Sequence, residues 1–379
     1  SHIGSTNLVP DLLQWRGHRA TTHSPLHYLE IKVARTLFGK NNLSLRLPAM
    51  VWGTAAVVLL YLAVGLRVGW PAGFFAGLFL AVDPLAVSWG RDARMYSGWL
   101  VVACVLLIYL PMLHAYVRRD ALRWGDWLNW RFWLLGMILM WAHASVIFAV
   151  TTIFAVALWL GVIGLVDCVR RRRSGVVLLA GAALSGAVYL GSWAMVGVAR
   201  ILAKSSRPPA DPALAGNMTE RFFGEMYESL LTLTGYLPVW LGLLLWLIAV
   251  VGIVLAVARG HWRFALLVVL IGAASAMTFP MIAPRHFFAA RYVIVLILTL
   301  ATGVGCAAGV MWSCGRGPGR WISRAVVVLA FLGLTAMWAP LLRQIITTPR
   351  TEYAEPFAVI RSHIRPGEVV TSVPEWYVE

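Results

Sequence analysis

Long apolar stretches separated by short polar loops run through most of the chain. A helix needs roughly 20 apolar residues to cross about 30 Å of hydrocarbon. Ten stretches approach that length, at 48–66, 70–89, 98–116, 131–142, 145–167, 176–198, 237–258, 264–282, 291–312 and 325–342. The stretch 131–142 is short, and the basic loops on both sides of 131–167 are the reason to place two crossings there. The pattern predicts an all-α polytopic membrane protein with about ten transmembrane helices.

Three regions are predicted from this pattern: a first loop at 1–47, a transmembrane domain at 48–342 and the start of a C-terminal segment at 343–379. Two helices that lie on the membrane are predicted in the first loop, because apolar residues recur there with helical spacing. They are Leu8, Leu12, Leu13 and Trp15, then Leu29, Val33, Leu37 and Phe38, closed by Gly39. A helix near 353–364 and a strand at 368–373 predict the start of a small α/β tail.

Composition agrees with the membrane class. The chain is 60% apolar and 13% charged, with a mean hydropathy of +0.76. A soluble domain carries about a quarter charged residues, so a water-facing surface is excluded for most of this chain. Its 19 tryptophans suit the boundary between lipid and water. The four cysteines lack the spacing of metal ligands and are interpreted as small core residues.

The net charge of +16 predicts orientation rather than a nucleic-acid partner, because basic residues collect in cytoplasmic loops. With residue 1 outside the cytoplasm, the short inner loops hold 14 of the 32 basic residues and three acidic ones, and the long loops fall outside. The basic residues are Arg67, Arg118, Arg119, Arg123, Arg131, Arg170, Arg171, Arg172, Arg173, Arg259, Arg263, Arg316, Arg320 and Arg324; the acidic ones are Asp120, Asp126 and Asp167. We therefore expect a multi-pass plasma-membrane protein. Low lysine with heavy Arg, Ala, Gly and Trp usage favours a bacterial inner membrane.

The candidate chemistry gathers on the predicted outer side. Asp83, followed by Pro84, lies in the second span, and the loop after that span contains four hydrogen-bonding groups: Arg91, Asp92, Arg94 and Tyr96. A carboxylate between arginines stays ionised. It can accept a proton, orient a hydroxyl or hold a divalent cation, while arginine suits a phosphate. The alternative is an interfacial salt bridge that pins a tight turn.

A second polar cluster occupies the first loop. It consists of Thr21, Thr22, His23, Ser24, His27 and Tyr28, followed by Glu30 and Lys32. The alternative interpretation is a polar loop that enters a surface helix. Two other polar positions stand at the ends of predicted spans: His143 follows Trp141-Ala142, and Arg291 precedes Tyr292, with Arg285 and His286 nearby. A histidine that caps a helix and an arginine that anchors one at the interface are the ordinary interpretations of these positions.

Both clusters resemble one family. The run Thr22-His-Ser-Pro-Leu-His-Tyr-Leu29, then Leu37-Phe-Gly39, then Leu45-Arg-Leu-Pro48, is similar to the first outer loop of polyprenyl-phosphate-dependent glycosyltransferases. These are GT-C fold enzymes of the protein O-mannosyltransferase and aminoarabinose transferase superfamily. The run Leu80 to Tyr96 resembles their second outer motif, and the intervening spacing is intact over about residues 20–110. Two later runs, Trp141-Ala-His143 and Arg291-Tyr292, resemble later motifs of the family less closely.

The resemblance implies inverting transfer of a sugar from a polyprenyl-phosphate donor to a protein, glycan or lipid acceptor outside the cytoplasm. Arg91, Arg94, Arg291 and His23 are the implied phosphate ligands, and Asp92 is the candidate catalytic base. His27, Tyr28, Tyr96, His143 and Arg285 are candidates for lining the substrate cavity. The family carries its leading acid after a span that precedes this point, and Ser24 and His27 replace a Pro and a Tyr. We therefore expect the sequence to be a piece of a longer protein.

Two alternatives belong to other functional classes. A transporter or flippase for lipid-linked sugars would need charges along a path across the spans. Asp83 is the one charge that the pattern places clearly inside a span, and no internal repeat is visible. A non-catalytic subunit with the same fold is the second alternative. An acidic residue shortly before Ser1, preceded by an apolar span, would favour the enzyme.

Overall fold

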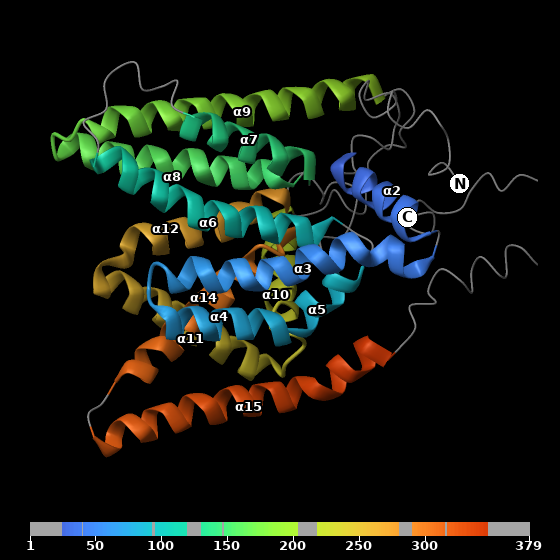
Figure 1. The fold of residues 1–379 in the computed structure, drawn as a ribbon, viewed down its shortest axis with the longest axis vertical. Coiled ribbons are helices and arrows are strands. Elements are labelled where there is room, and N and C mark those ends of the chain that lie inside the picture. The colour runs from blue at the N-terminus through green and yellow to red at the C-terminus, as the bar shows by residue number, and fades with distance from the viewer. Residues whose placement is uncertain are drawn as a thin grey trace, which may run out of the picture.

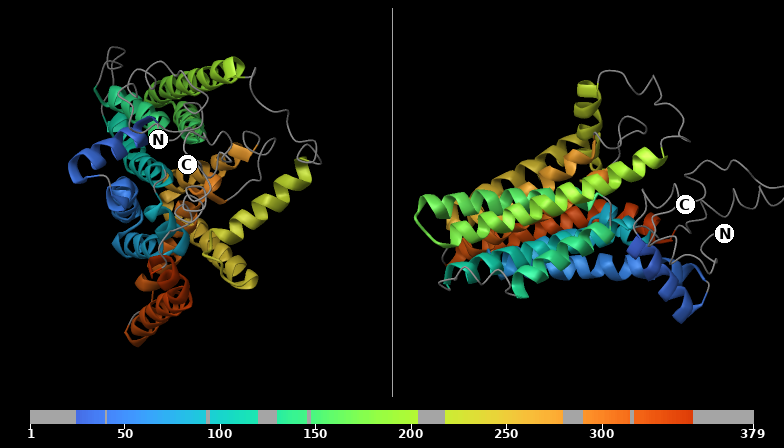
Figure 2. Two further views of the ribbon diagram at one scale, coloured as in Figure 1. Left: turned by 90° about the vertical axis from the view of Figure 1, so that its right-hand side faces the viewer. Right: turned by 90° about the horizontal axis from the view of Figure 1, so that it is seen from above.

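The computed structural model describes residues 25–39, 41–92, 95–119, 130–145, 148–203, 218–279, 290–314 and 317–347. These residues form helices and contain no strand. The helices run side by side as an elongated bundle, with short connections at one end and α2 at the other (Figures 1 and 2). The predicted all-α class is confirmed. The tail at 348–379 and the first surface helix, around Leu8 to Trp15, lie outside the described residues.

The first half of the bundle contains eight helices. They are α2 (Pro25–Phe38), α3 (Asn42–Gly65), α4 (Trp70–Val82), α5 (Pro84–Arg91), α6 (Tyr96–Arg119), α7 (Trp130–Ser145), α8 (Ala149–Val169) and α9 (Ser174–Ala203). Helix α3 packs against both α4 and α6, and α8 packs against α9. Helix α3 begins at a capping box, in which Asn41 accepts a hydrogen bond from the Ser44 amide at 2.7 Å.

The second half comprises α10 (Met218–Thr232), α11 (Val239–Ala256), the π-turn η4 (Val257–His261), α12 (Trp262–Ser275), the 3₁₀ turns η5 (Ala276–Thr278) and η6 (Ala290–Val293), α14 (Leu296–Ser313) and α15 (Pro318–Thr347). Helix α14 lies between α4 and α11. Glycines make this close packing possible. A Cβ on Gly252 of α11 would come within 1.8 Å of the Gly303 carbonyl oxygen of α14, so any side chain would force the helices apart.

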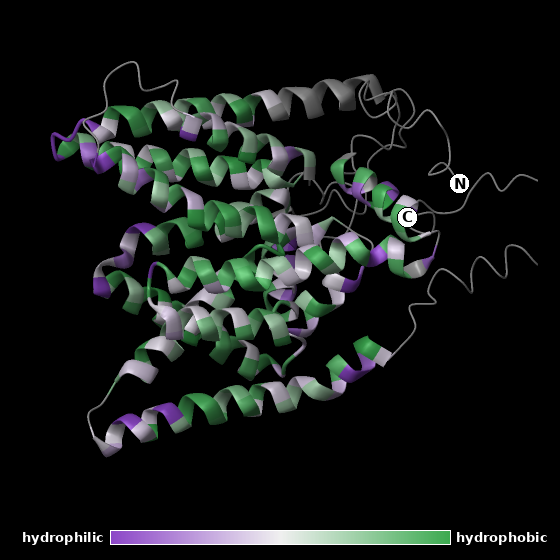
Figure 3. Cartoon of the chain, in the orientation of Figure 1, coloured by the Kyte–Doolittle hydropathy of each residue, from purple (hydrophilic) through white to green (hydrophobic). Residues whose placement is uncertain are grey.

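Within the part of the chain that the structure describes, seven helical runs are long and apolar enough to cross a membrane, or eight if the bent pair α4 and α5 is one span. The count of about ten is therefore not confirmed. One run, Val239–Thr278, is 40 residues long and joins two predicted spans. Gly260, with φ of 90°, interrupts it where the loop was predicted. The short stretch 131–142 lies inside the 16-residue helix α7. Apolar residues cover the lengths of the helices, as a membrane protein requires (Figure 3).

The second predicted span is broken at Asp83. Helices α4 and α5 meet there at 61°. Asp83 is the N-cap of α5, because its Oδ1 accepts the Ala86 amide at 2.8 Å, and Pro84 occupies the first helical position. The carboxyl group is fully buried. Helix α5 then packs against α3, where a Cβ on Gly53 would lie 3.2 Å from the Gly90 Cα. This bend sets the position of the polar loop after α5.

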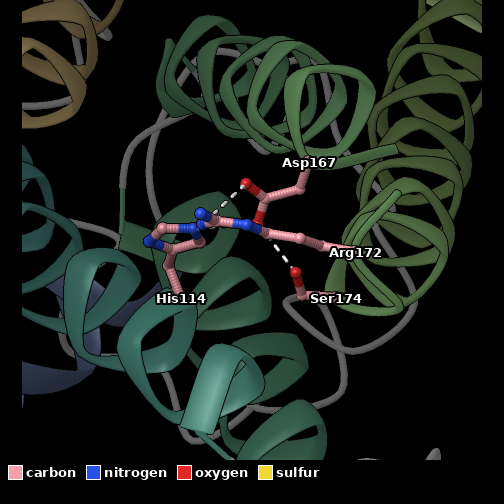
Figure 4. A network of polar contacts seen from close by, with 4 residues as sticks. All are labelled: His114, Asp167, Arg172 and Ser174. Atoms are coloured by element: carbon pink, nitrogen blue, oxygen red, sulfur yellow. Dashed lines mark hydrogen bonds and ion pairs between the residues drawn. The ribbon is translucent and has the colours of Figure 1, made fainter. Parts of the chain in front are cut away.

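A buried polar network ties α6, α8 and α9 together (Figure 4). Asp167, predicted to lie in an inner loop, is instead a fully buried residue of α8. Its Oδ2 accepts a hydrogen bond from Ser174 Oγ at 2.8 Å and lies 3.3 Å from His114 Nε2, while Oδ1 lies 3.8 Å from Arg172. The prediction that Asp83 alone is charged inside the spans was therefore wrong. The partners of Asp167 indicate a structural contact between helices.

Candidate functional site

Helix α2 has one exposed apolar face and one face against the bundle. Leu29, Val33, Leu37 and Phe38 are 45 to 70% exposed, and Gly39 ends the helix with φ of 81°. This confirms the second helix predicted in the first loop and its exposed apolar face, and its position on the membrane surface stays a prediction. The opposite face is buried through His27, Ile31 and Ala34. Because residues three apart share a helix face, Glu30 points the same way as His27.

A narrow cleft, with free space of about 10 Å³ or roughly one water molecule, lies where α2 meets α3, α6 and α7. It is lined by His27, Glu30, Trp52, Met95, Gly98 and Trp141. Met95 is the turn residue directly before α6, and Gly98 lies in the first turn of that helix, shortly after the loop that carries Asp92. The first-loop motif and the second outer motif, about 65 residues apart in the predicted pattern, therefore meet at one end of the bundle.

Glu30 is the carboxylate that lines this cleft. Its Oε2 accepts a hydrogen bond from Trp52 Nε1 at 2.9 Å and lies 3.8 Å from His27 Nδ1. Trp52 in turn contacts Trp141 with ring centroids 6.0 Å apart. A carboxylate, an imidazole and two indole rings offer hydrogen bonds and apolar faces of the kind a sugar needs, but the cleft as it stands is too small to admit a sugar ring. Glu30 was part of the first polar cluster but was not predicted as a site residue.

The second motif lies beside this cleft. Asp92 comes directly after α5, and its amide donates to the Trp89 carbonyl at 3.3 Å. Asp92 is not among the described residues that line the cleft. Arg91 is half-buried, and its Nη1 has no hydrogen-bond partner among the described residues. Tyr96 is buried and packs on Trp89, with ring centroids 5.9 Å apart. Arg94 lies outside the described residues.

The remaining predicted residues are only partly placed. His23 and Arg285 lie outside the described residues, and the backbone of Tyr28 lies in α2. His143 belongs to α7, two residues after Trp141 of the cleft. Arg291 belongs to η6, and a row of rings links η6 to the start of α6. In that row Tyr292 lies 5.3 Å from Phe148, and Phe148 lies 6.2 Å from Trp99.

No described group of three His, Cys, Asp or Glu side chains is arranged to hold a metal ion. The divalent cation that Asp92 was predicted to accommodate stays a prediction. The described part of the site can do acid–base and hydrogen-bonding chemistry through Glu30, His27 and Asp92, and can bind an anion through Arg91. These groups lie at the end of the bundle where α2 leaves an apolar surface exposed.

Comparison with known proteins identifies the fold. Residues 22–164 match the family model described as dolichyl-phosphate-mannose-protein mannosyltransferase. No curated protein matches the chain. A crystal structure of ArnT from Cupriavidus metallidurans bound to undecaprenyl phosphate aligns with a TM-score of 0.50 and 14% identity, over 95% of this chain and 75% of that one. The apo form of ArnT gives a TM-score of 0.49 and 14% identity over 89% of this chain, which spans 66% of that chain's length.

The matched range 22–164 begins beside the first motif and includes both sides of the cleft. The predicted resemblance is thereby confirmed for the fold: the chain is a multi-pass membrane protein with an ArnT-like GT-C fold, and residues 22–164 are similar to the mannosyltransferase family.

Proposed function

We propose that the protein is a membrane glycosyltransferase that moves a sugar from a polyprenyl-phosphate donor to an acceptor by an inverting reaction. One observation carries the proposal. The two motifs that suggested glycosyl transfer meet at a cleft, and that cleft lies within the range that matches the mannosyltransferase model. The ArnT structure that shares the fold was solved with undecaprenyl phosphate, which supports a lipid of that chemistry as the donor carrier.

We assign the binding of the donor phosphate to the cationic side chains at this end of the bundle. Arg91 has a buried Nη1 without a hydrogen-bond partner among the described residues, so an anionic oxygen would satisfy it. Arg94, Arg291 and His23 are the further phosphate ligands that we propose, with Arg285 close to Arg291 in sequence. As the bond between sugar and phosphate breaks, negative charge grows on the phosphate. Fixed cations at that position lower the barrier.

Asp92 is the proposed general base that removes the proton from the acceptor hydroxyl as the new glycosidic bond forms. Positioned bases typically contribute about 10²- to 10⁴-fold to a rate. Glu30 and His27 line the cleft and would hydrogen-bond the hydroxyl groups of the sugar. Tyr28, Tyr96 and His143 complete the proposed surroundings. A divalent cation at Asp92 would serve the same phosphate.

We further propose a bacterial inner-membrane location with the cleft outside the cytoplasm. The distribution of arginines supports this orientation. Residues 67, 118–119, 170–173 and 259–263 occupy the end of the bundle opposite the cleft, where hydrophilic residues gather (Figure 3). The exposed apolar face of α2 fits a helix that rests on the outer surface of the lipid.

The test is a transfer assay of the full-length protein in proteoliposomes against a panel of radiolabelled polyprenyl-phosphate sugars. We expect label to move to an acceptor fraction with at least one donor, and the polyprenyl phosphate to be released in equal amount. Movement of intact lipid-linked sugar between leaflets, with no bond broken, would instead identify a flippase. Neither reaction with any donor would identify a non-catalytic subunit.

A further inference from the structure

A second cavity lies at the end of the bundle opposite the cleft. Its volume is about 480 Å³, and it lies between the ends of α3 and α6, Trp159 in the middle of α8, and the turn that joins α11 to α12. Helix α6 shows the separation, because Gly98 lines the cleft and His114 lines this cavity. Sixteen residues of helix span roughly 24 Å. This cavity is therefore distinct from the candidate site, and a ligand bound in it would not depend on the proposed function.

Half of the lining residues of this cavity are basic. Four arginines and two histidines contribute to it, and none of its described lining residues is acidic; the six are Arg67, Arg118, Arg119, Arg263, His114 and His261. They come from three loops or helix ends that are remote in sequence. The four guanidiniums around one hollow repel one another unless an anion lies between them.

Two of the arginines lack polar partners. The Nε atoms of Arg67 and Arg263 are buried and have no hydrogen-bond partner among the described residues. None of the four arginines forms an ion pair with a described carboxylate. Burial also lowers the pKa of Arg67, because desolvation disfavours its charged form. Both side chains are half-buried, and a buried N–H without an acceptor is costly, so the two Nε atoms suit a ligand that supplies acceptor oxygens.

The buried carboxylate of Asp167 already contacts three side chains and forms no ion pair with the arginines that line the cavity. Asp167 lies behind His114 and binds His114, Ser174 and Arg172 (Figure 4). Its contact with His114 fixes that ring at the wall of the cavity. Asp167 therefore orients one imidazole of the lining and leaves the four arginines without a carboxylate ligand.

We propose that this cavity binds a phosphate-bearing anion, with Arg67 and Arg263 as its principal ligands and Arg118 and Arg119 at its mouth. The planar fork of arginine matches phosphate oxygens in two-point contacts. Two sources share this chemistry: the head group of an anionic phospholipid and a free phosphate compound. Basic pockets between the ends of transmembrane helices are suited to lipid head groups. Leu66, Pro111 and Trp159 add apolar walls to the same cavity.

The experiment uses full-length protein purified in detergent and stripped of lipid. Native mass spectrometry measures bound phosphatidylglycerol against phosphatidylcholine, and calorimetry measures binding of inorganic pyrophosphate. The variant R67Q/R263Q removes both half-buried guanidiniums. The matched control R173Q/R320Q removes two exposed arginines at the same end of the bundle, outside the cavity.

We expect R67Q/R263Q to raise the dissociation constant of the bound species by at least about tenfold, since hydrogen bonds to charged groups are involved. The control keeps the wild-type constant. Selective retention of phosphatidylglycerol identifies the lipid head group, and binding of pyrophosphate alone identifies a free phosphate compound. Absence of binding by either probe, or equal losses in R67Q/R263Q and the control, would overturn the proposal.

A lysine variant distinguishes loss of the phosphate ligands from misfolding of the protein. R67K/R263K keeps both charges and should keep most of the binding. Should R67Q/R263Q fail to give monodisperse protein, R118Q/R119Q replaces it, because both residues are exposed at the end of α6. The same loss relative to the control is then expected, and unchanged binding would again contradict the site.

Discussion

Trp52 donates its indole Nε1–H to Oε2 of Glu30 across 2.9 Å, joining the surface helix α2 to the transmembrane helix α3. Both residues line the cleft at which the two outer motifs meet. Trp52 is thereby both a wall of the candidate site and an anchor for α2. The position of Glu30 depends on this bond, since its other near partner is His27 at 3.8 Å.

Replacing Trp52 with phenylalanine should loosen α2. The carboxylate of Glu30 loses a hydrogen-bond donor, and a half-buried acceptor without its partner costs about 1–3 kcal/mol. We expect a lower midpoint of thermal unfolding in detergent and slower sugar transfer. Trp133→Phe is the matched control, because Trp133 is 62% exposed on α7. Equal effects of the two changes would show that the contact with Glu30 does not stabilise α2.

Gly252→Ala should destabilise the bundle. The new Cβ would lie 1.8 Å from the Gly303 carbonyl oxygen, so α11 and α14 must separate. Forced overpacking of this kind costs roughly 1–3 kcal/mol. Gly186→Ala in α9 is the control, because nothing lies within 4 Å of its added Cβ. Thermal unfolding should show a loss for Gly252→Ala alone, and an unchanged midpoint would contradict the close contact of the two helices.

Asp167→Asn tests whether the buried network is structural. The change removes the charge that faces His114 and Arg172 while keeping an acceptor for Ser174. Loss of one partner from a buried pair costs about 3–5 kcal/mol. Arg172→Gln should cost less, because the Arg172 side chain is 38% exposed. Transfer per folded molecule should be unchanged in both variants. A selective loss of transfer without loss of stability would assign Asp167 to the reaction or to a transport path.

Orientation can be measured by labelling with a membrane-impermeant maleimide. Cys314, at the end of α14, is exposed and is predicted to face the cytoplasm. It should react only after the cells are lysed. In a variant in which Cys314 and Cys168 are alanine, Leu37→Cys on the exposed face of α2 should react in intact cells. The reverse pattern would place the cleft on the cytoplasmic side.

The sequence predicted the helical class and α2 because both depend on periodicity. Leu29, Val33 and Leu37 recur at helical spacing, and Gly39 closes the helix as expected. The break at Asp83 was not predicted, although an N-cap aspartate before a proline was a visible signal. The stretch 70–89 is apolar almost throughout, so hydropathy alone favours one continuous span.

The sequence predicted which segments form the candidate site, but not which side chains contact one another there. That the two motifs lie at one end of the bundle was a consequence of the predicted topology. That Glu30 rather than Asp92 lines the cleft depends on the rotation of α2 against Trp52, a tertiary contact that no local pattern encodes. The burial of Asp167 has the same origin, because its partners His114 and Ser174 belong to other helices.

The central proposal is that Asp92 serves glycosyl transfer at this end of the bundle. The most direct measurement is the initial rate of sugar transfer by Asp92→Asn protein, compared with wild type and with Glu228→Gln, a change at an exposed carboxylate of α10. We predict a fall of at least about a hundredfold for Asp92→Asn, since a general base is lost, and the wild-type rate for Glu228→Gln. A near wild-type rate in correctly folded Asp92→Asn protein would contradict the proposed mechanism.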